Sequence, residues 1–558
     1  MHRTRRAVAL AALLAVASVV SGGARAATAQ VPAEAEPARP MVFVHGGAGS
    51  GAQFESQAMR FASNGYPADY IRVLEYNSAN PAGFGAIPAQ LDALIADIQA
   101  DTGADQVDLL GHSLGTGLMQ SYLSDPARAA NIAHYVNIDG ADADAPPGGV
   151  PTLALWGQGN PTDEITGATN VHFDDQSHVE VATSRESFRE IYKFFNDGTE
   201  PATIDIAPQS SDEIEIAGRA VNFPSNDGVQ DALLTIYEVD DATGARVGAP
   251  VATFPLSGDG SFGPFDADFG KRYEYVITRE GSDRAHHLYL PPVIRSDYLV
   301  RLLSSPPGQG LDALIERSDG HTALVITRYK EWWGDHPTRS DILMVDGTDV
   351  LNAATSPVSK NAIGVFAFDV GSDGTTSLGA PIPTLFGLPF ITGVDHFVPA
   401  ADPTDRTVEI LNAPRGDLTQ LQKMTVPNWA SSRNAVSVQF DDHLQNAEGS
   451  LGYVARYPDG LCNAIRRFAR GLGLGTPEDL VRLGVDALRD VAEAGGAVPI
   501  ATPPANDGPC DVLLDWAPPD AAAVDAAATA WGVSSDQLHN AGGVLVVWLT
   551  YLAVFGGG

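Results

Sequence analysis

The pattern of apolar and polar residues changes twice along this chain. Between residues 41 and 199, short apolar runs alternate with segments in which apolar residues recur at helical spacing. This alternation predicts a parallel sheet with helices on both faces, that is, an α/β domain. The predicted strands are 41–44, 70–74, 107–110, 135–138, 152–156 and 170–173, and the predicted helices are 90–100 and 184–195.

Beyond residue 200 the apolar residues alternate with period two, interrupted by Gly, Pro, Asp and Asn, which is typical of an all-β sandwich or barrel. We expect a small β-sandwich module at 200–283 and a larger barrel-like module at 284–444. From 445 to 558 the pattern turns helical and ends in the apolar run 544–555, which is too short to span a bilayer. The strands predicted between residues 200 and 444 are 213–217, 232–239, 272–278, 323–327, 362–370 and 435–440.

The first 26 residues have the composition of a secretory signal peptide. Arginines precede an apolar run at 7–20, and small residues follow it up to Ala26. We therefore expect residues 1–26 to be removed and the mature protein to be secreted or to lie at the cell surface. Residues 27–40 are rich in Ala, Pro and Glu and predict a flexible leader.

The net charge indicates which partners to expect, and the cysteines indicate whether a disulfide is present. The net charge is −35, and it becomes −39 once the four arginines of residues 1–26 are removed. Such a charge excludes nucleic acid as a partner and argues that any contact of the C-terminal modules with a lipid surface is apolar. Cys462 and Cys510 are the two cysteines of the chain, and in an exported protein they predict one disulfide. The sequence does not indicate an oligomeric state.

A Gly-x-Ser-x-Gly pentapeptide, Gly111 to Gly115, lies between a predicted strand and a predicted helix. A serine hydroxyl is a weak nucleophile at neutral pH, so it needs a tight strand-to-helix turn that exposes it to a histidine and to backbone N–H donors. The flanking glycines permit this turn. Ser113 is therefore the candidate nucleophile.

The candidate base is His178, which follows a short polar loop and precedes the last helix of the α/β domain. His172 lies in a strand pattern and is better explained as structural. Two carboxylates remain open as the acid that orients the histidine. Asp139 stands directly at a strand end and is favoured over Asp163, which is displaced by three residues from a turn where Asn160 occupies the position expected for a carboxylate.

The glycine-rich turn 45–50 follows the first predicted strand. Its Gly47 N–H and the N–H of Leu114 form the natural pair of oxyanion donors, one from each loop. No Lys follows this turn and it lacks the Gly-x-Gly-x-x-Gly spacing, so a phosphate site is disfavoured. A cation site at the acidic run 139–144 is the weaker alternative, and we expect no metal and no cofactor.

These motifs together resemble bacterial and archaeal lipases of the small α/β-hydrolase type, and the whole arrangement looks closest to the Archaeoglobus-type lipases. The resemblance rests on FVHGGAGS at 43–50, LLGHSLG at 109–115, the early Asp139, and QSHVEVATS at 176–184. It covers residues 41–443. It implies an α/β-hydrolase domain followed by a β-rich lipid-binding region, cleavage of long-chain carboxylic esters, and the triad Ser113, Asp139 and His178.

The expected function is that of a secreted serine hydrolase, a lipase or carboxylesterase for medium to long acyl chains that forms an acyl-enzyme on Ser113. Two alternatives stay open. A polyester, lactone or amide hydrolase would use the same triad, because pocket shape selects the acyl group. A cell-surface binding protein could instead keep the hydrolase domain as an inactive scaffold for its β modules.

Overall fold

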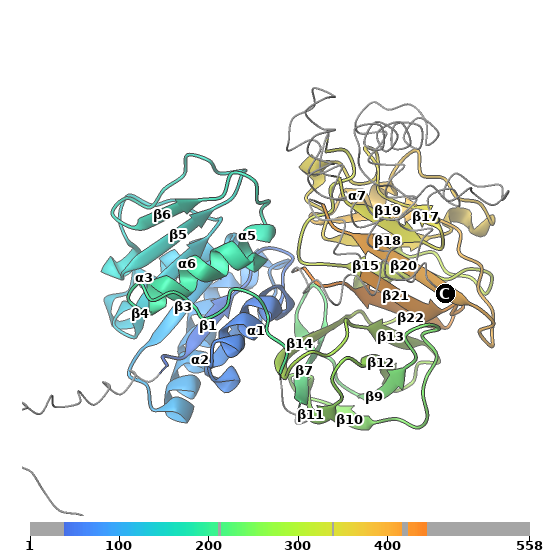
Figure 1. Ribbon diagram of the computed structural model, residues 1–558, viewed down its shortest axis with the longest axis horizontal. Coiled ribbons are helices and arrows are strands. Elements are labelled where there is room, and N and C mark those ends of the chain that lie inside the picture. The colour runs from blue at the N-terminus through green and yellow to red at the C-terminus, as the bar shows by residue number, and fades with distance from the viewer. Residues whose placement is uncertain (1–37, 210–213, 337–339, 416–421, 443–558) are drawn as a thin grey trace, which may run out of the picture. The chain divides into compact units, whose positions relative to one another are not determined.

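The computed structural model describes residues 38–209, 214–336, 340–415 and 422–442 (Figure 1). The predicted signal peptide, the leader up to residue 37, the helical region 445–558 and the Cys462–Cys510 disulfide lie outside the described residues. Among the residues that are described, we find no helix with the length and apolar character needed to cross a membrane.

The N-terminal part, the parallel-sheet domain (residues 39–209), is built on a sheet that in the described residues has the strand order β2-β1-β3-β4-β5-β6, with every neighbouring pair parallel. The predicted α/β architecture is confirmed. The strands are β1 (Met41–Val44), β2 (Ile71–Leu74), β3 (Val107–His112), β4 (Ile132–Ile138), β5 (Thr152–Trp156) and β6 (Thr169–His172). The helices are α1 (Glu55–Ser63), α2 (Ile87–Thr102), α3 (Leu114–Leu123), α4 (Pro126–Ala129), α5 (Glu180–Thr183) and α6 (Arg185–Phe195).

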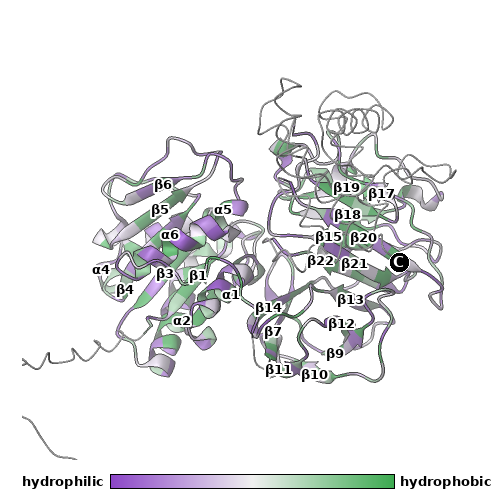
Figure 2. Ribbon diagram, viewed as in Figure 1, coloured by the Kyte–Doolittle hydropathy of each residue, from purple (hydrophilic) through white to green (hydrophobic). Residues whose placement is uncertain are grey.

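Two apolar clusters cover the two faces of this sheet. Helices α1 and α6 cover one face and α2 and α3 the other, and the apolar strands between them are visible in Figure 2. Helix α2 presents buried Leu91, Ile95 and Ile98 at helical spacing and ends at Gly103, whose left-handed backbone closes the helix. Burial of both faces explains why strands such as β1 and β5 are almost entirely apolar.

Residues 214–304 form the first β module. A sheet with the order β11-β7-β14 packs through a shared apolar core against strands β10, β9, β12 and β13. The expected division near residue 283 would separate β12 from β13, which are adjacent antiparallel strands of one sheet, so the module extends beyond that point. Its strands are β7 (Ile214–Asn222), β8 (Asp227–Gly228), β9 (Ala232–Val239), β10 (Ala252–Leu256), β11 (Ser261–Ala267), β12 (Arg272–Arg279), β13 (Ala285–Tyr289) and β14 (Asp297–Ser304).

Residues 310–442 form the second β module. Strands β22, β15, β18 and β19 continue the sheet of β13, and across the described part of the module they pack against a sheet of order β17-β16-β20-β21. The barrel expected here is thus two open sheets packed face to face. The elements are β15 (Leu324–Thr327), β16 (Ile342–Val345), β17 (Thr348–Asp349), β18 (Gly364–Phe368), α7 (Pro383–Phe386), β19 (Ile391–Asp395), β20 (Thr407–Ala413), β21 (Gln422–Pro427) and β22 (Asn434–Gln439).

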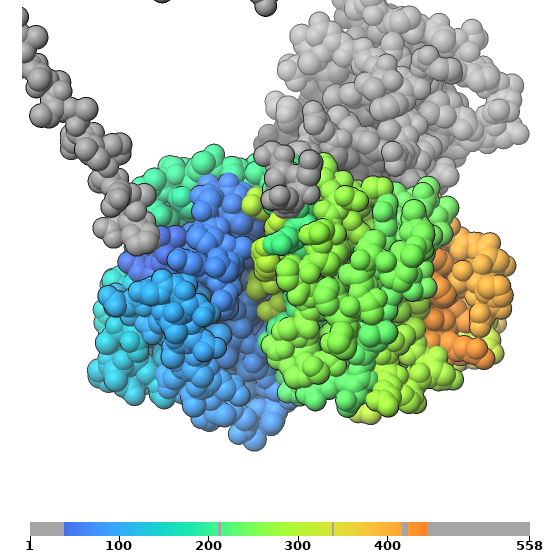
Figure 3. Space-filling model, turned by 90° about the horizontal axis from the view of Figure 1, so that it is seen from below, coloured from blue at the N-terminus to red at the C-terminus, as the bar shows by residue number. Residues whose placement is uncertain are grey.

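The parallel-sheet domain contacts both β modules through buried polar groups, and Figure 3 shows its blue surface beside the green surface of the first module. Arg301 on β14 donates to Glu75, which follows β2, at 2.6 Å, and both side chains are almost completely buried. Glu331 of the second module accepts from the Val179 N–H at 2.6 Å. A buried charge is costly to leave unpaired, so these pairs tie the modules to the domain.

Candidate active site

Ser113 lies on the sharp turn between β3 and α3. Its backbone has φ 52° and ψ −122°, a strained conformation for a residue with a side chain. The Ser113 N–H donates to the Ile138 carbonyl at 2.9 Å, which fixes the turn against β4. A Cβ at position 115 would lie 2.5 Å from the Val44 carbonyl oxygen, so glycine is required for α3 to pack this closely on β1. The turn predicted from the pentapeptide is present.

Asp139 and His178 meet at the carboxyl end of the sheet. His178 Nδ1 is 2.6 Å from Asp139 Oδ2, and the other carboxylate oxygen accepts from the Gly157 N–H at 2.6 Å and from Asn160 Nδ2 at 2.9 Å. Since Asp139 uses Nδ1 of the ring, Nε2 is the nitrogen that remains for a proton from another group. The carboxylate is therefore placed to hold the imidazole in one tautomer.

Electrostatics favour an ion pair in this position. Burial alone would raise the pKa of Asp139, but the hydrogen bond and charge of His178 and the Gly157 and Asn160 donors lower it below its ordinary value. Burial also opposes the charged form of His178, yet the hydrogen bond and charge of Asp139 raise the pKa of His178 above 6.5, with a further contribution from the charge of Glu331. The site thus stabilises an imidazolium beside an ionised carboxylate.

His112, which precedes Ser113, supports the loop of His178. Its Nε2 donates to the His178 carbonyl at 3.0 Å, so its Nδ1 accepts from Gln53 Nε2 at 2.8 Å. Burial, with the neighbouring His178 charge, lowers the pKa of His112 to about 3. The ring is therefore neutral and acts as a brace between the nucleophile turn and the histidine loop.

The loop 45–49 faces Ser113 from β1. A Cβ on Gly46 would lie 2.8 Å from the Ser113 Cβ, and one on Gly47 would lie 3.9 Å from Leu114 Cδ2. The two predicted oxyanion donors therefore belong to loops that lie against each other. Asn226 of the first β module holds this loop, because its amide donates to the Gly49 carbonyl at 2.8 Å and to His45 Nε2 at 3.2 Å.

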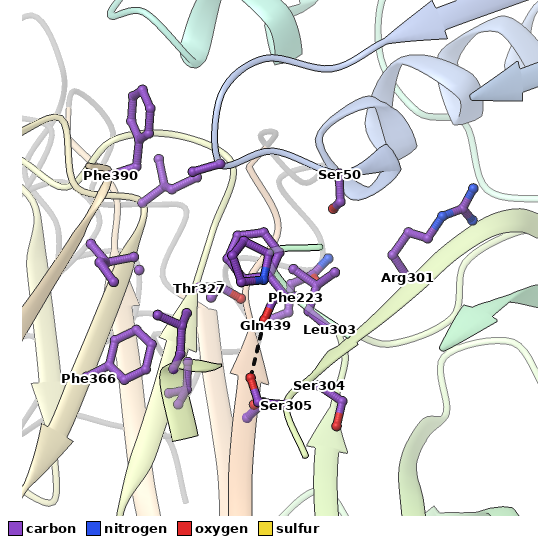
Figure 4. Close-up of a pocket in the computed structure, with 18 of the residues that line it drawn as sticks. Ser50, Phe223, Arg301, Leu303, Ser304, Ser305, Thr327, Phe366, Phe390 and Gln439 are labelled. Atoms are coloured by element: carbon purple, nitrogen blue, oxygen red, sulfur yellow. Dashed lines mark hydrogen bonds between the residues drawn. The ribbon is translucent and has the colours of Figure 1, made fainter. Parts of the chain in front are cut away.

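A cavity of about 460 Å³ opens beside this loop. Residues 47–50 form its wall on the side of the parallel-sheet domain, and apolar side chains of both β modules form most of the remainder. Figure 4 shows Ser50, Leu303, Thr327, Phe366 and Phe390 around the space. Its volume lies in the range of cavities that bind small ligands.

Phe390 joins the cavity to the histidine. Its ring stacks on the His178 imidazole with a centroid distance of 5.9 Å and an interplanar angle of 12°. The backbone of Phe390 has φ 60°, which is unusual for a bulky side chain and costs on the order of 1 kcal/mol. The second β module therefore contributes a strained aromatic residue to the wall beside the candidate base.

The structure brings His178 into a hydrogen bond with Asp139, which follows β4, and Ser113 follows the neighbouring strand β3. Asp163 lies instead beside His172. The Asp163 carbonyl accepts from His172 Nε2 at 3.0 Å, in keeping with the structural interpretation of His172. Asn160, which occupies the position expected for a carboxylate, binds Asp139 instead. The described residues contain no group of three or more His, Cys, Asp or Glu side chains that could hold a metal ion.

The individual residues that the β modules contribute to the site were not predicted. Asn226, Glu331 and Phe390 contact the loops of the site from positions far along the chain. None of them belongs to a local motif, and the sequence contains no signal that would have identified them. The sequence shows Asn160 at the position expected for a carboxylate. Only the structure shows that the Asn160 amide donates to Asp139.

Comparison with family models assigns the parts of the chain. The model for class 2 lipases matches residues 38–125, which include the glycine-rich loop and Ser113. This part of the chain is similar to the class 2 lipases. A model for the lipase C-terminal domain matches residues 212–307, which include the first β module. A third model, which describes a C-terminal domain, matches residues 310–444, and these residues include the second β module.

No curated protein matches the chain at a significant level. Solved structures similar to parts of it include lipase B of Aspergillus fumigatus, with 13% identity and a TM-score of 0.24 over 30% of this chain and 54% of that protein. A predicted hydrolase of Thermoplasma acidophilum has 13% identity and a TM-score of 0.23 over 29% and 87%. Phospholipase PlaB of Legionella pneumophila has 11% identity and a TM-score of 0.22 over 44% and 86%. Such TM-scores are too low to support a conclusion about function.

Proposed function

We propose that the protein is a serine hydrolase that cleaves carboxylic esters with medium to long acyl chains. The observation that carries this proposal is the 2.6 Å hydrogen bond between His178 and Asp139 at the strand ends beside the strained turn of Ser113. The match of residues 38–125 to the class 2 lipase model supports ester hydrolysis.

In the proposed mechanism, His178 Nε2 removes the proton of Ser113 as Oγ attacks the ester carbonyl carbon. Negative charge develops on the carbonyl oxygen and is stabilised by the N–H groups of Gly47 and Leu114. When the carbon–oxygen bond to the leaving alcohol breaks, His178 returns the proton to that alcohol, leaving an acyl group on Ser113. Water then repeats the sequence, releasing the carboxylic acid and free Ser113. Asp139 holds the ring and stabilises its cationic form.

The cavity supports the proposal that the substrate carries a long acyl chain. Its lining is mostly apolar, and it begins at residues 47–50, where the carbonyl oxygen of the ester would be bound. Apolar surface removed from water stabilises binding by about 25 cal/mol per Å², so each further buried methylene strengthens binding by about 0.8 kcal/mol. The β modules thus serve the proposed reaction as the wall of the acyl site.

The test is turnover of p-nitrophenyl esters with acyl chains of 4 to 16 carbons by the full-length protein. We expect kcat/KM to rise with chain length and the variant Ser113→Ala to lose activity on every ester, while its melting temperature stays near that of the wild type because the side chain is small and only half-buried. Substantial turnover by the folded variant would refute the assignment of Ser113. Equal kcat/KM across the series would refute the acyl site.

A further inference from the structure

Glu331 of the second β module contacts the segment that carries the candidate base. Its side chain is fully buried. One carboxylate oxygen accepts from the Val179 N–H at 2.6 Å, and the other accepts from the Glu180 N–H at 3.2 Å and from the Ser177 hydroxyl. These three donors lie immediately before and after His178, so one carboxylate holds the chain on both sides of the base.

The charge of Glu331 belongs to a buried network. Arg415 pairs with Glu180 at 2.5 Å and also donates to the Ser177 hydroxyl at 2.8 Å. Lys330 pairs with Glu180 at 2.7 Å. Further ion pairs connect Asp341 to Arg328 and Arg415. The network thus contains as many basic as acidic side chains: Arg328, Lys330 and Arg415 beside Glu180, Glu331 and Asp341. Pairing of opposite charges offsets the cost of burying them.

The loop before His178, residues 173–178, has no regular secondary structure, so its position depends on its contacts. His112 holds the His178 carbonyl from the nucleophile turn, and Asp139 holds the ring. Glu331, which belongs to the second β module, holds the main chain after His178 and the Ser177 side chain before it.

We propose that Glu331 is a positioning residue of the active site, whose carboxylate fixes the His178 loop so that the imidazole meets Ser113 in the correct orientation. This assignment rests on the proposed serine hydrolase function. The geometry makes the second β module part of the catalytic assembly as well as a wall of the acyl cavity. A displacement of about 1 Å in a catalytic group lowers turnover by up to about 10²-fold, so the loss of this anchor should appear in kcat.

The carboxylate has a second effect, through charge. The charged or titratable groups that face His178 are Asp139, Glu331 and the neutral His112. The charge of Glu331 raises the pKa of His178, so its removal lowers that pKa. The acid limb of kcat/KM reports deprotonation of the base in the free enzyme and should therefore move to lower pH. A purely structural contact would not produce this shift.

The experiment compares Glu331→Gln, Glu331→Asp and a matched control, Glu274→Gln, in the full-length protein with p-nitrophenyl butyrate. Glu274 is also a fully buried carboxylate, but it pairs with Arg246 and His287 inside the first β module. Circular dichroism and melting temperature report folding. Initial rates between pH 5 and 9 give kcat, KM and the position of the acid limb for each variant.

For Glu331→Gln we expect kcat to fall about 10- to 100-fold with KM little changed and the acid limb at lower pH. Glu331→Asp keeps the charge but displaces the carboxylate, so its kcat should fall while the acid limb stays in place. Glu274→Gln should keep the wild-type kcat and acid limb. Should Glu331→Gln not fold, folded Glu331→Asp decides, and a wild-type kcat there overturns the proposal.

Wild-type kcat and an unmoved acid limb in folded Glu331→Gln would also overturn it, as would the same losses in Glu274→Gln, because they would then follow from removing any buried carboxylate. These outcomes leave the proposed function intact as long as the wild type hydrolyses esters through Ser113. An inactive wild type would overturn the proposed function, and the role of Glu331 with it.

Discussion

Replacing Asp139 by Asn should remove the orientation of His178 while leaving the fold intact. The carboxylate oxygen that accepts from Gly157 and Asn160 can be replaced by the amide oxygen of Asn, so these two hydrogen bonds remain. The amide nitrogen then faces His178 Nδ1, where it donates a hydrogen bond. The ring must accept with Nδ1 and carry its proton on Nε2, the tautomer that cannot take the proton of Ser113.

The expected loss in kcat for Asp139→Asn is about 10⁴, as for the same change in other triads, which corresponds to about 5.4 kcal/mol of transition-state stabilisation. Removing the charge also lowers the pKa of His178, which Asp139 raises above 6.5, so the acid limb of the remaining activity should move to lower pH. Asp163→Asn is the control and should stay within about threefold of the wild type, because its recorded contact to His172 is through the main chain.

The assay is turnover of p-nitrophenyl butyrate from pH 5 to 9 for the wild type and both variants, with melting temperatures recorded in parallel. A kcat for folded Asp139→Asn within tenfold of the wild type would refute the assignment of Asp139. A large loss in Asp163→Asn with a small loss in Asp139→Asn would move the role to Asp163.

Gly46→Ala should lower kcat at least about 10-fold, since the new Cβ would lie 2.8 Å from the Cβ of Ser113, and an unchanged rate of acylation in stopped-flow measurements would contradict this close approach. Phe390→Ala removes the ring that lies on His178 and forms part of the cavity wall, so kcat/KM should fall about 10-fold more for a 16-carbon than for a 4-carbon ester, and equal losses would count against a role in the acyl site. Leu303→Trp fills the cavity and should shift the preferred chain length in the p-nitrophenyl series to shorter acyl groups, whereas an unchanged profile would place the acyl chain elsewhere.

The parallel-sheet domain could be predicted because its signals are local. Its central strands are short, mostly apolar segments, and the helices α2 and α6 show apolar residues at helical spacing. Ser113 stands in a turn whose glycines are required by close backbone contacts. The Gly-x-Ser-x-Gly motif therefore predicts the turn directly. Asp139 and His178 follow from the order of strands and loops, because parallel strands bring their carboxyl ends to one edge.

The strands of the β region and its division into two modules were predicted, but the pairing of the strands was not, because that pairing is non-local. Strand β22 lies between β13 and β15, and no property of residues 434–439 indicates which strands they pair with. The expected division near residue 283 separates β12 from β13, which pair as antiparallel neighbours in one sheet. The contacts of Asn226, Glu331 and Phe390 with the site could not be predicted either, because a contact between modules leaves no local pattern in the sequence.

The central claim, that Ser113 is an activated nucleophile, is tested most directly by labelling the full-length protein with a fluorophosphonate and mapping the modified peptide by mass spectrometry. The account predicts one equivalent of label on Ser113, no label in Ser113→Ala, and strongly slowed labelling in Asp139→Asn. Absence of label from the folded wild type, or its attachment to another serine, would contradict the account.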